Sequence, residues 1–294
     1  MKVEVKRSLL TWKNIHPNAN VRAGTYNKFI RILINQDANQ TMYKKFLPVL
    51  FIVLWANGVA AEMKLSTGLD YSEGKYGSTI KTSQWTLPLV ARYESENWSA
   101  KLSLPYVHIK NVNPGAGGEA LPCGAALTTP KNVSGFGDLV ASGSYTVYQD
   151  NGYLIDLGSR VKFATGDTKK CLSSGKNDYS AQIDIAKKLE QWTVFGTAGW
   201  TKKGDPDFAG VAVDYRNPFF YTVGSSYNFG NGVSAGASYD YRQRLISTGD
   251  PISELTLFVT LKQSSRFKIQ SYVVTGFSNA SVDRGIGIVA TYGF

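Results

Sequence analysis

The amino-acid sequence predicts an all-β protein: a transmembrane, antiparallel, up-and-down β-barrel of twelve strands behind an N-terminal signal peptide. Three observations lead to this fold class. A short apolar segment near the start has the layout of a secretory signal peptide. The chain after residue 61 consists of segments of about ten residues in which apolar and polar residues alternate. No stretch after residue 61 approaches the roughly twenty apolar residues of a membrane helix, so a membrane location has to come from strands.

The first part of the chain carries most of the net charge. The 294 residues have a formal net charge of +10, and residues 1–61 contribute +7 of it through nine Lys and Arg against two Asp and Glu. A nucleic-acid partner is therefore not expected, because the rest of the chain is nearly balanced. Residues 1–41 show few apolar residues in any regular pattern, which predicts an over-extended start or a disordered leader.

The signal peptide is predicted at residues 42–61. Two lysines form its basic beginning, and residues 46–55 form an apolar run that is too short to span a bilayer as a helix. Small residues, Val59 and Ala61, stand where a signal peptidase reads the chain. Cleavage there would leave residues 62–294 as the outer-membrane barrel. The alternative interpretation of the apolar segment is a buried core helix.

Twelve segments of the exported part have the period-two alternation of strands. In one of them, Ala100, Leu102 and Leu104 form an apolar face, with Lys101 and Ser103 between them. Aromatic residues gather near the segment ends, which is typical of the two girdles of a membrane barrel, although a soluble β-sandwich is the alternative. The predicted strands lie at 63–72, 79–93, 98–112, 136–148, 153–164, 179–189, 192–203, 218–228, 233–245, 253–263, 267–277 and 284–294.

The connections between these strands are alternately short and long. Every second connection is a short turn, as on the periplasmic side of such barrels, and the longer ones are expected outside the cell. Cys123 and Cys171 fall in two of the long loops, where an oxidising compartment would permit a disulfide between them. That bond would close about fifty residues and contribute about 4 kcal/mol; two free thiols are the alternative.

The last predicted strand ends on an aromatic residue. Ile286, Ile288 and Tyr292 alternate with small or polar residues before Phe294. This resembles the terminal strand of outer-membrane barrels, and the resemblance implies insertion by the barrel assembly machinery. That machinery and the outer-membrane lipid are therefore expected partners.

Catalytic and metal-binding patterns are sparse after residue 61. His108 is the only histidine there, and no zinc, nucleophile-elbow or phosphate-loop motif accompanies it. We expect a hydrogen-bonding or solvent-facing histidine rather than a catalytic one. The sequence predicts no enzyme activity, no metal and no cofactor.

The polar face of the strands is expected to line the lumen, where its charges meet water or each other. Bases outnumber acids on this face, which predicts a modest preference for anions if the pore is open; charges that pair across the lumen would plug it. A barrel of twelve strands is intermediate in width between a small barrel filled by its own side chains and a wide porin. A narrow path for small solutes is therefore expected. The lumen-lining candidates are Arg92, Lys101, Asp156, Arg160, Lys162, Asp184, Asp240, Arg242, Arg244 and Lys262, and the same face is assigned Lys64, Asp70, Asp138, Lys188, Glu254, Lys268 and Arg284.

Three segments carry a family resemblance: SGFGDLVASGSYTVY from Ser134, GSRVKFATGD from Gly158 and LSSGKNDYSAQIDIAKKL from Leu172. They are similar to the outer-membrane barrels named for the MetA pathway of phenol degradation, although Ala164 stands where that family would have proline. The resemblance implies a barrel that helps aromatic or other hydrophobic compounds to enter. Its most specific residues are Gly135, Gly137, Asp138, Thr165, Gly166 and Asp167. Glycine and aspartate at such positions also have a structural interpretation, as turn and capping residues.

The sequence therefore favours an outer-membrane channel or transporter for small solutes, possible substrates being aromatic or hydrophobic compounds. The alternative is a plugged structural or adhesion barrel that acts through its extracellular loops.

Overall fold

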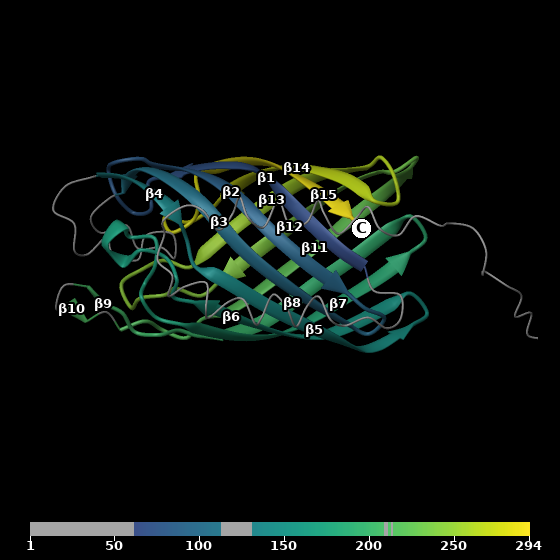
Figure 1. Cartoon of the computed structure of the whole chain (residues 1–294), viewed down its shortest axis with the longest axis horizontal. Coiled ribbons are helices and arrows are strands. Elements are labelled where there is room, and N and C mark those ends of the chain that lie inside the picture. The colour runs from purple at the N-terminus through teal and green to yellow at the C-terminus, as the bar shows by residue number, and fades with distance from the viewer. Residues whose placement is uncertain (1–61, 113–130, 209–210, 213) are drawn as a thin grey trace, which may run out of the picture. The chain divides into compact units, whose positions relative to one another are not determined.

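The computed structural model describes residues 62–112, 131–208, 211–212 and 214–294, which fold as an antiparallel β-barrel. Its strands are β1 (Glu62–Gly74), β2 (Thr82–Glu94), β3 (Trp98–Val112), β4 (Lys131–Phe136), β5 (Leu139–Asp150), β6 (Tyr153–Phe163), β7 (Asp178–Leu189), β8 (Trp192–Lys202), β9 (Asp207–Phe208), β10 (Val211–Ala212), β11 (Phe219–Gly230), β12 (Val233–Arg242), β13 (Ile252–Lys262), β14 (Phe267–Gly276) and β15 (Arg284–Gly293). The strands run obliquely across the barrel (Figure 1). β1 pairs with both β2 and β15, which closes the wall.

The predicted fold class and the predicted twelve strands are confirmed. β4 and β5 pair with successive parts of β3 and together form one strand of the wall, and the small pair of β9 and β10 forms a sheet of its own. The predicted signal peptide and residues 1–41 lie outside the described residues, so that division of the chain stays a prediction.

One strand of the wall is longer than predicted and is interrupted. The chain leaves the ladder between β4 and β5 at Gly137 and Asp138. Pro105 of β3 stands opposite this break and has no N–H to donate, while its carbonyl accepts from Gly137 N at 2.9 Å. The break turns the Asp138 carboxylate out of the ladder and toward the 164–177 loop.

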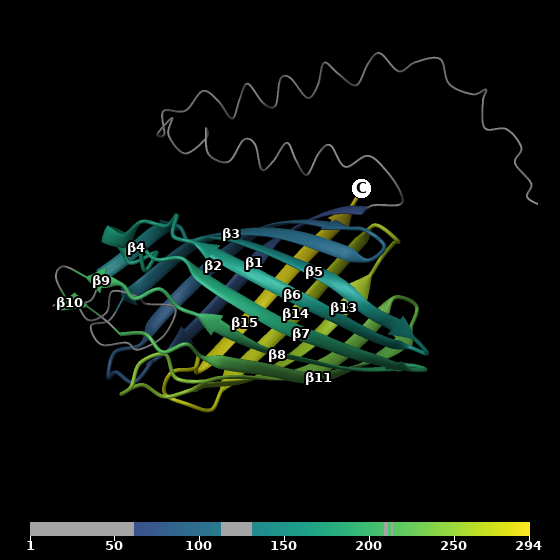
Figure 2. The same cartoon turned by 90° about the horizontal axis from the view of Figure 1, so that it is seen from below.

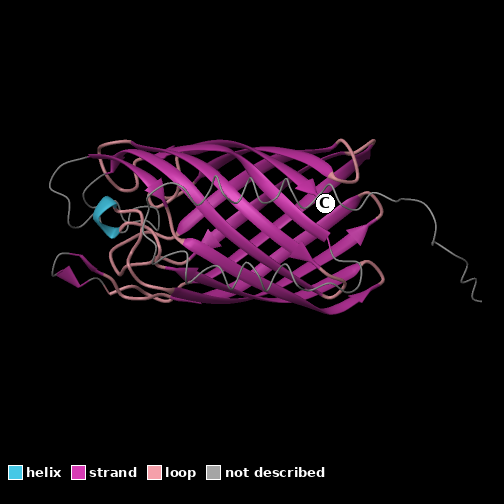
Figure 3. Cartoon of the chain, in the orientation of Figure 1, coloured by secondary structure: helices cyan, strands magenta, loops and turns pink. Residues whose placement is uncertain are grey.

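The barrel has two different ends. Short turns join β2 to β3, β5 to β6, β7 to β8, β11 to β12 and β13 to β14 at the end where β15 finishes, which we call the turn end (Figures 1 and 2). The longer connections, including the 3-10 helix η2 (Thr168–Lys170) and the pair of β9 and β10, lie at the opposite end, which we call the loop end (Figure 3). The predicted alternation of short and long connections is confirmed.

The outer face of the wall is apolar. Large aliphatic side chains stand at alternate positions of the strands and are about half exposed, as with Val223 at 53% and Ile286 at 58%. Aromatic pairs lie at both ends: the ring centroids of Tyr71 and Trp85 are 4.8 Å apart at the loop end, and another such pair lies at the turn end. Exposed apolar surface of this extent indicates contact with another apolar phase. Among the described residues, no helix is both long and apolar enough to cross a membrane.

Buried apolar residues gather inside the wall at the loop end. Val107 and Ile109 of β3 and Val133 of β4 form a cluster there, and Leu172 of the 164–177 loop packs with them. Because the first three side chains face the interior, the loop must fold into the mouth of the barrel to reach them. The 164–177 loop therefore covers one side of the barrel mouth from inside the lumen.

Candidate solute pathway

The inward face of the strands holds most of the charged residues that the sequence assigned to it. The register places Arg92 opposite Lys101, and Asp156 opposite Asp184, at positions that alternate with the exposed apolar residues. Arg92 and Lys101 are exposed although they face inward, so the interior is open to solvent at this level. The predicted residues at inward positions are Arg92, Lys101, Asp156, Arg160, Lys162, Asp184, Asp240, Arg242 and Lys262.

Two predicted lumen residues lie elsewhere. β12 ends at Arg242, so Arg244 belongs to the 243–251 connection instead of the wall, and it borders a polar cavity there. Arg284 takes an outward position on β15, where its side chain is 74% exposed and pairs with Glu73. Three acids that sequence reasoning left out take inward positions: Glu62, Glu94 and Asp178. The predicted excess of bases on the inward face is therefore not found.

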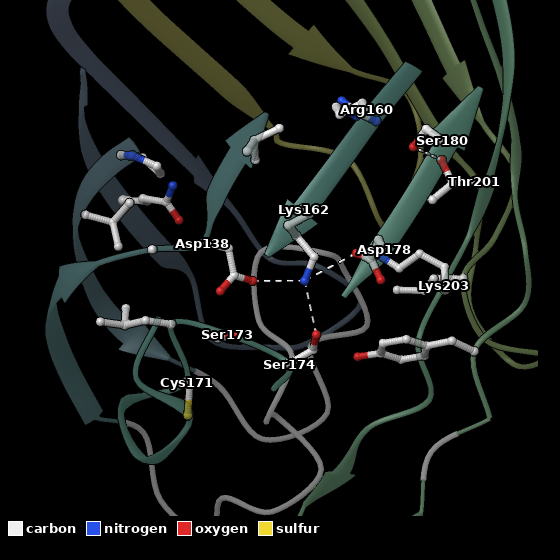
Figure 4. A pocket seen from close by; sticks show the side chains of 18 of the residues that line it. Asp138, Arg160, Lys162, Cys171, Ser173, Ser174, Asp178, Ser180, Thr201 and Lys203 are labelled. Atoms are coloured by element: carbon white, nitrogen blue, oxygen red, sulfur yellow. Dashed lines mark hydrogen bonds and ion pairs between the residues drawn. The ribbon is translucent and has the colours of Figure 1, made fainter. Parts of the chain in front are cut away.

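Ion pairs anchor the 164–177 loop inside the loop end. Lys162 Nζ lies 2.9 Å from Asp138 Oδ2 and 3.2 Å from Asp178 Oδ2, and Lys203 Nζ lies 2.7 Å from the same Asp178 oxygen (Figure 4). Lys162 also donates to Ser174 Oγ of the loop at 3.1 Å. These side chains form the polar part of the lining of a cavity of about 310 Å³. Because the charges satisfy one another, this cluster stabilises the loop.

Asp138, a residue of the family motif, caps the start of the same loop. Its Oδ1 accepts from the backbone N–H groups of Thr165 and Gly166, each at 3.0 Å. Thr165 Oγ1 in turn accepts from Leu139 N at 2.8 Å. The Thr165 hydroxyl thus satisfies the N–H of Leu139 next to the strand break, and the Asp138 carboxylate binds two N–H groups at the start of the loop after β6.

The remaining motif residues also shape the loop. Asp167 is the N-cap of η2 and accepts from two of its backbone N–H groups. Gly135 and Gly166 make room for Leu172, because a Cβ on either would come within 2.7 Å of it. With Gly137 at the strand break, the motif has a structural role in this geometry.

Two tyrosines of the connections, the buried Tyr76 and the half-buried Tyr215, lie at the loop end. Burial, together with the carboxylates of Glu254 and Asp283, raises the pKa of Tyr76 to about 12. Burial also raises the pKa of Tyr215, although the ammonium of Lys203 opposes the shift. Both hydroxyls therefore stay protonated at neutral pH and remain available as hydrogen-bond donors.

A row of cations crosses the wall nearer the middle of the barrel. Arg92, Lys101, Ser142 and Arg160 stand directly opposite one another on β2, β3, β5 and β6 and border one cavity of about 190 Å³. Within the described part of the chain, neither Lys101 nor Arg160 forms an ion pair, and Ser142 Oγ is buried without a hydrogen-bond partner. Arg92 does pair, with Glu94 at 2.8 Å. The row thus contains two cations and one hydroxyl with unused binding capacity.

A second row, of carboxylates, runs across the neighbouring strands. The register connects Asp156, Asp184, Thr197, Thr222, Asp240 and Glu254 in that order. Thr197 Oγ1 donates to Asp184 Oδ1 and Thr222 Oγ1 to Asp240 Oδ1, each at 2.5 Å. Gln182 Nε2 donates to both oxygens of Asp184, at 2.9 and 2.8 Å. Neutral donors therefore occupy much of the hydrogen-bonding capacity of Asp184 and Asp240, whereas Asp156 Oδ1 is buried without a hydrogen-bond partner among the described residues.

Aromatic side chains line the other part of the lumen. Phe195, Phe220, Phe258 and Tyr272 face inward, and they lie over Gly224, Gly199, Gly236 and Gly287 of neighbouring strands. A Cβ on Gly287 would come within 2.4 Å of Tyr272 Cζ. Sequence reasoning missed these rings because it assigned apolar residues to the outer face. The signal was their position in the alternation, since Phe195 follows the outward Val194.

Two further predictions concern the cysteines and His108. Cys171 is 2% exposed in the buried cluster, but Cys123 lies outside the described residues, so the disulfide stays a prediction.

His108 takes an outward position, and its Nδ1 lies 2.6 Å from Ser134 Oγ. Among the described residues, no acid or amide contacts its other ring nitrogen, as a catalytic triad would need.

Residues 128–275, just over half of the chain, match the family described as protein of unknown function (DUF3187). The chain belongs to the DUF3187 family. A comparison with curated proteins finds no match for this DUF3187 chain. The resemblance to the phenol-degradation barrels stays a prediction.

Solved structures with a similar fold include membrane channels. This DUF3187 barrel is similar to an outer membrane channel from Pseudomonas putida F1, with 14% sequence identity and a TM-score of 0.59 over 81% of this chain and 97% of that one. It is also similar to the NanC porin, with 10% identity and a TM-score of 0.51 over 78% of this chain and 98% of the porin. At these identities the likeness concerns the fold.

Proposed function

We propose that this DUF3187 barrel is a channel of the bacterial outer membrane through which small solutes pass. The observation that carries the proposal is the contrast between the two faces of one closed wall. The outer face is apolar with aromatic ends, and the inner face is charged and open to solvent at Arg92 and Lys101. A bilayer accommodates the first face, and hydrated solutes suit the second.

The proposal includes a route to that membrane. Residues 42–61 act as the signal peptide, and the barrel assembly machinery and outer-membrane lipid are the partners in insertion. Aromatic or other hydrophobic compounds are the finer substrate proposal. The inward-facing rings of Phe195, Phe220 and Phe258 support it, as does the resemblance to the phenol-degradation barrels. We propose no enzymatic role.

A plugged barrel that acts through its loops is the second candidate function. It is favoured by one observation, the 164–177 loop that Lys162 and Asp138 anchor inside the mouth. Such a loop can either close the lumen or narrow a path that stays open.

Single-channel recording in planar bilayers tests both candidates. We expect discrete conductance steps from the wild-type protein, purified from membranes, and larger or less stable steps from an Asp138→Ala/Lys162→Ala variant, because that variant loses the anchors of the loop. Silence of the wild type with conductance of the variant would indicate a plugged barrel. Silence of both proteins, when heat-modifiable migration on gels shows that they are folded, would rule out a channel.

A further inference from the structure

We propose that the row of Arg92, Lys101, Ser142 and Arg160 is a binding site for small monocarboxylates, with a preference for those that carry an aromatic ring. This inference rests on the proposed channel function, because it names the solute class that the lumen would select. It concerns the cavity of about 190 Å³ between β2, β3, β5, β6 and β7.

The cations of this row face each other, and their mutual repulsion lowers the stability of the fold. Arg92 and Lys101 are directly opposed on paired strands, and like charges in that position destabilise a sheet. Two other lumen lysines contact carboxylates: Lys64 contacts Glu94, and Lys162 contacts Asp138. Lys262 and Lys268 also face each other, near the turn end, without an ion pair among the described residues, but no buried hydroxyl without a partner lies beside them. Lys101 and Arg160 have no such contact among the described residues, so an anion from outside the chain is the partner that would relieve the repulsion.

The neutral donor of the row fits a carboxylate as well. Ser142 stands between Lys101 and Arg160 in the register, and its buried hydroxyl has no partner within the described residues. A buried hydroxyl without a hydrogen bond carries a free-energy cost that a bound oxygen would remove. A planar guanidinium, an ammonium and a hydroxyl together match the two oxygens of one carboxylate.

The surroundings of the row select a monoanion with an aromatic body. The Asp184 carboxylate borders the same cavity, and it would repel a second negative charge on the ligand. Phe220 lies next to this cavity and does not border it; its ring centroid is 5.9 Å from Arg160 Cζ, so it offers an apolar face close to one end of the row. The cavity of about 190 Å³ has room for a ligand with one aromatic ring.

Equilibrium binding of benzoate tests the site without requiring conduction. In calorimetric titration of the protein purified from membranes, we expect benzoate to bind and phosphate to bind more weakly. Lys101→Ser/Arg160→Ser should weaken benzoate binding about tenfold or more, because two charge-assisted contacts are lost. The matched control is Lys262→Ser/Lys268→Ser, which removes two inward-facing lysines at the turn end and should leave benzoate binding unchanged.

A third variant examines the aromatic preference. Phe220→Leu should weaken benzoate binding while acetate binding stays the same, because only benzoate presents a ring to that face. Benzoate binding that is absent, or equal in wild type and the Lys101→Ser/Arg160→Ser variant, would overturn the site. In parallel, benzoate should interrupt the single-channel current of the wild type. Binding without conductance would overturn the channel and keep the site, and conductance without binding would do the reverse.

Discussion

Arg160 and Lys162 stand two residues apart on the same face of β6, yet their surroundings are opposite. Lys162 contacts two carboxylates and a serine of the 164–177 loop. Arg160 has no ion pair among the described residues and lies over the ring of Phe220. The difference indicates that charged residues at the loop end stabilise the fold, whereas those nearer the middle of the lumen remain available to a solute.

The strongest test of this contrast compares Lys162→Met with Arg160→Met. Removing Lys162 leaves Asp138 without its cation, and we expect a loss of about 2–4 kcal/mol in the free energy of unfolding, below the range for fully buried pairs because Lys162 is 23% exposed. Arg160→Met should cost less than about 1 kcal/mol. Urea unfolding in detergent micelles, followed by tryptophan fluorescence, measures both. Equal losses would contradict the division between structural and available charges.

The aromatic side chains of the lumen allow a second test of which lumen residues stabilise the fold. Gly287→Ala should push Tyr272 aside and break its hydrogen bond to Asp70, which is 2.5 Å long. We expect a loss of about 1–2 kcal/mol in the free energy of unfolding, typical of overpacking. In a Tyr272→Ala background the same substitution should be nearly neutral, and a double-mutant cycle measures the coupling. A coupling of zero would mean that the ring does not need the glycine.

A smaller effect is expected on ion selectivity. Arg160→Ser should lower the chloride-to-potassium permeability ratio by about twofold, because it removes a lumen cation that forms no ion pair with the described residues. Asp184→Asn should change the ratio less, because Thr197 and Gln182 already donate to that carboxylate. Reversal potentials in a salt gradient give both ratios. A larger change in the Asp184→Asn variant would show that the hydrogen bonds from Thr197 and Gln182 do not reduce the influence of the Asp184 carboxylate on passing ions.

The smallest effect is expected on the outer face. His108→Ala should leave both conductance and benzoate binding unchanged, because His108 points away from the lumen and contacts Ser134. Purified wild-type protein should also fail to hydrolyse lipid esters and peptides. Hydrolysis that disappears in the variant would contradict the proposal that the protein is not an enzyme.

Most of the fold could be predicted from the sequence, because the period-two alternation and the turn residues are local signals. The predicted starts and ends of most strands agree with the structure to within a few residues. The interruption of the strand at Gly137 was missed, since its cause is Pro105 on the neighbouring strand. A pattern within one segment contains no information about the residue that stands opposite.

The candidate site was predictable only in part, for the same reason. Alternation identified Lys101 and Arg160 as lumen residues but could not show which lumen charges pair. That depends on the register, which brings Asp178 opposite Lys162. Phe220 was missed because an aromatic residue facing the lumen contradicts the usual pattern of a membrane barrel.

The closing pair of β1 and β15 has a consequence for how the chain folds. Ser66 and Thr291, whose hydroxyls are 2.8 Å apart, are separated by 225 positions, so this contact can form only after almost the whole domain has been made. Contacts of such long range slow folding, because the entropy of a large loop is lost before the contact is gained. Until then both strands present unpaired edges that can join another chain. The protein therefore needs protection against aggregation between synthesis and closure, and truncation within either strand should impair assembly more than the loss of an entire outer loop.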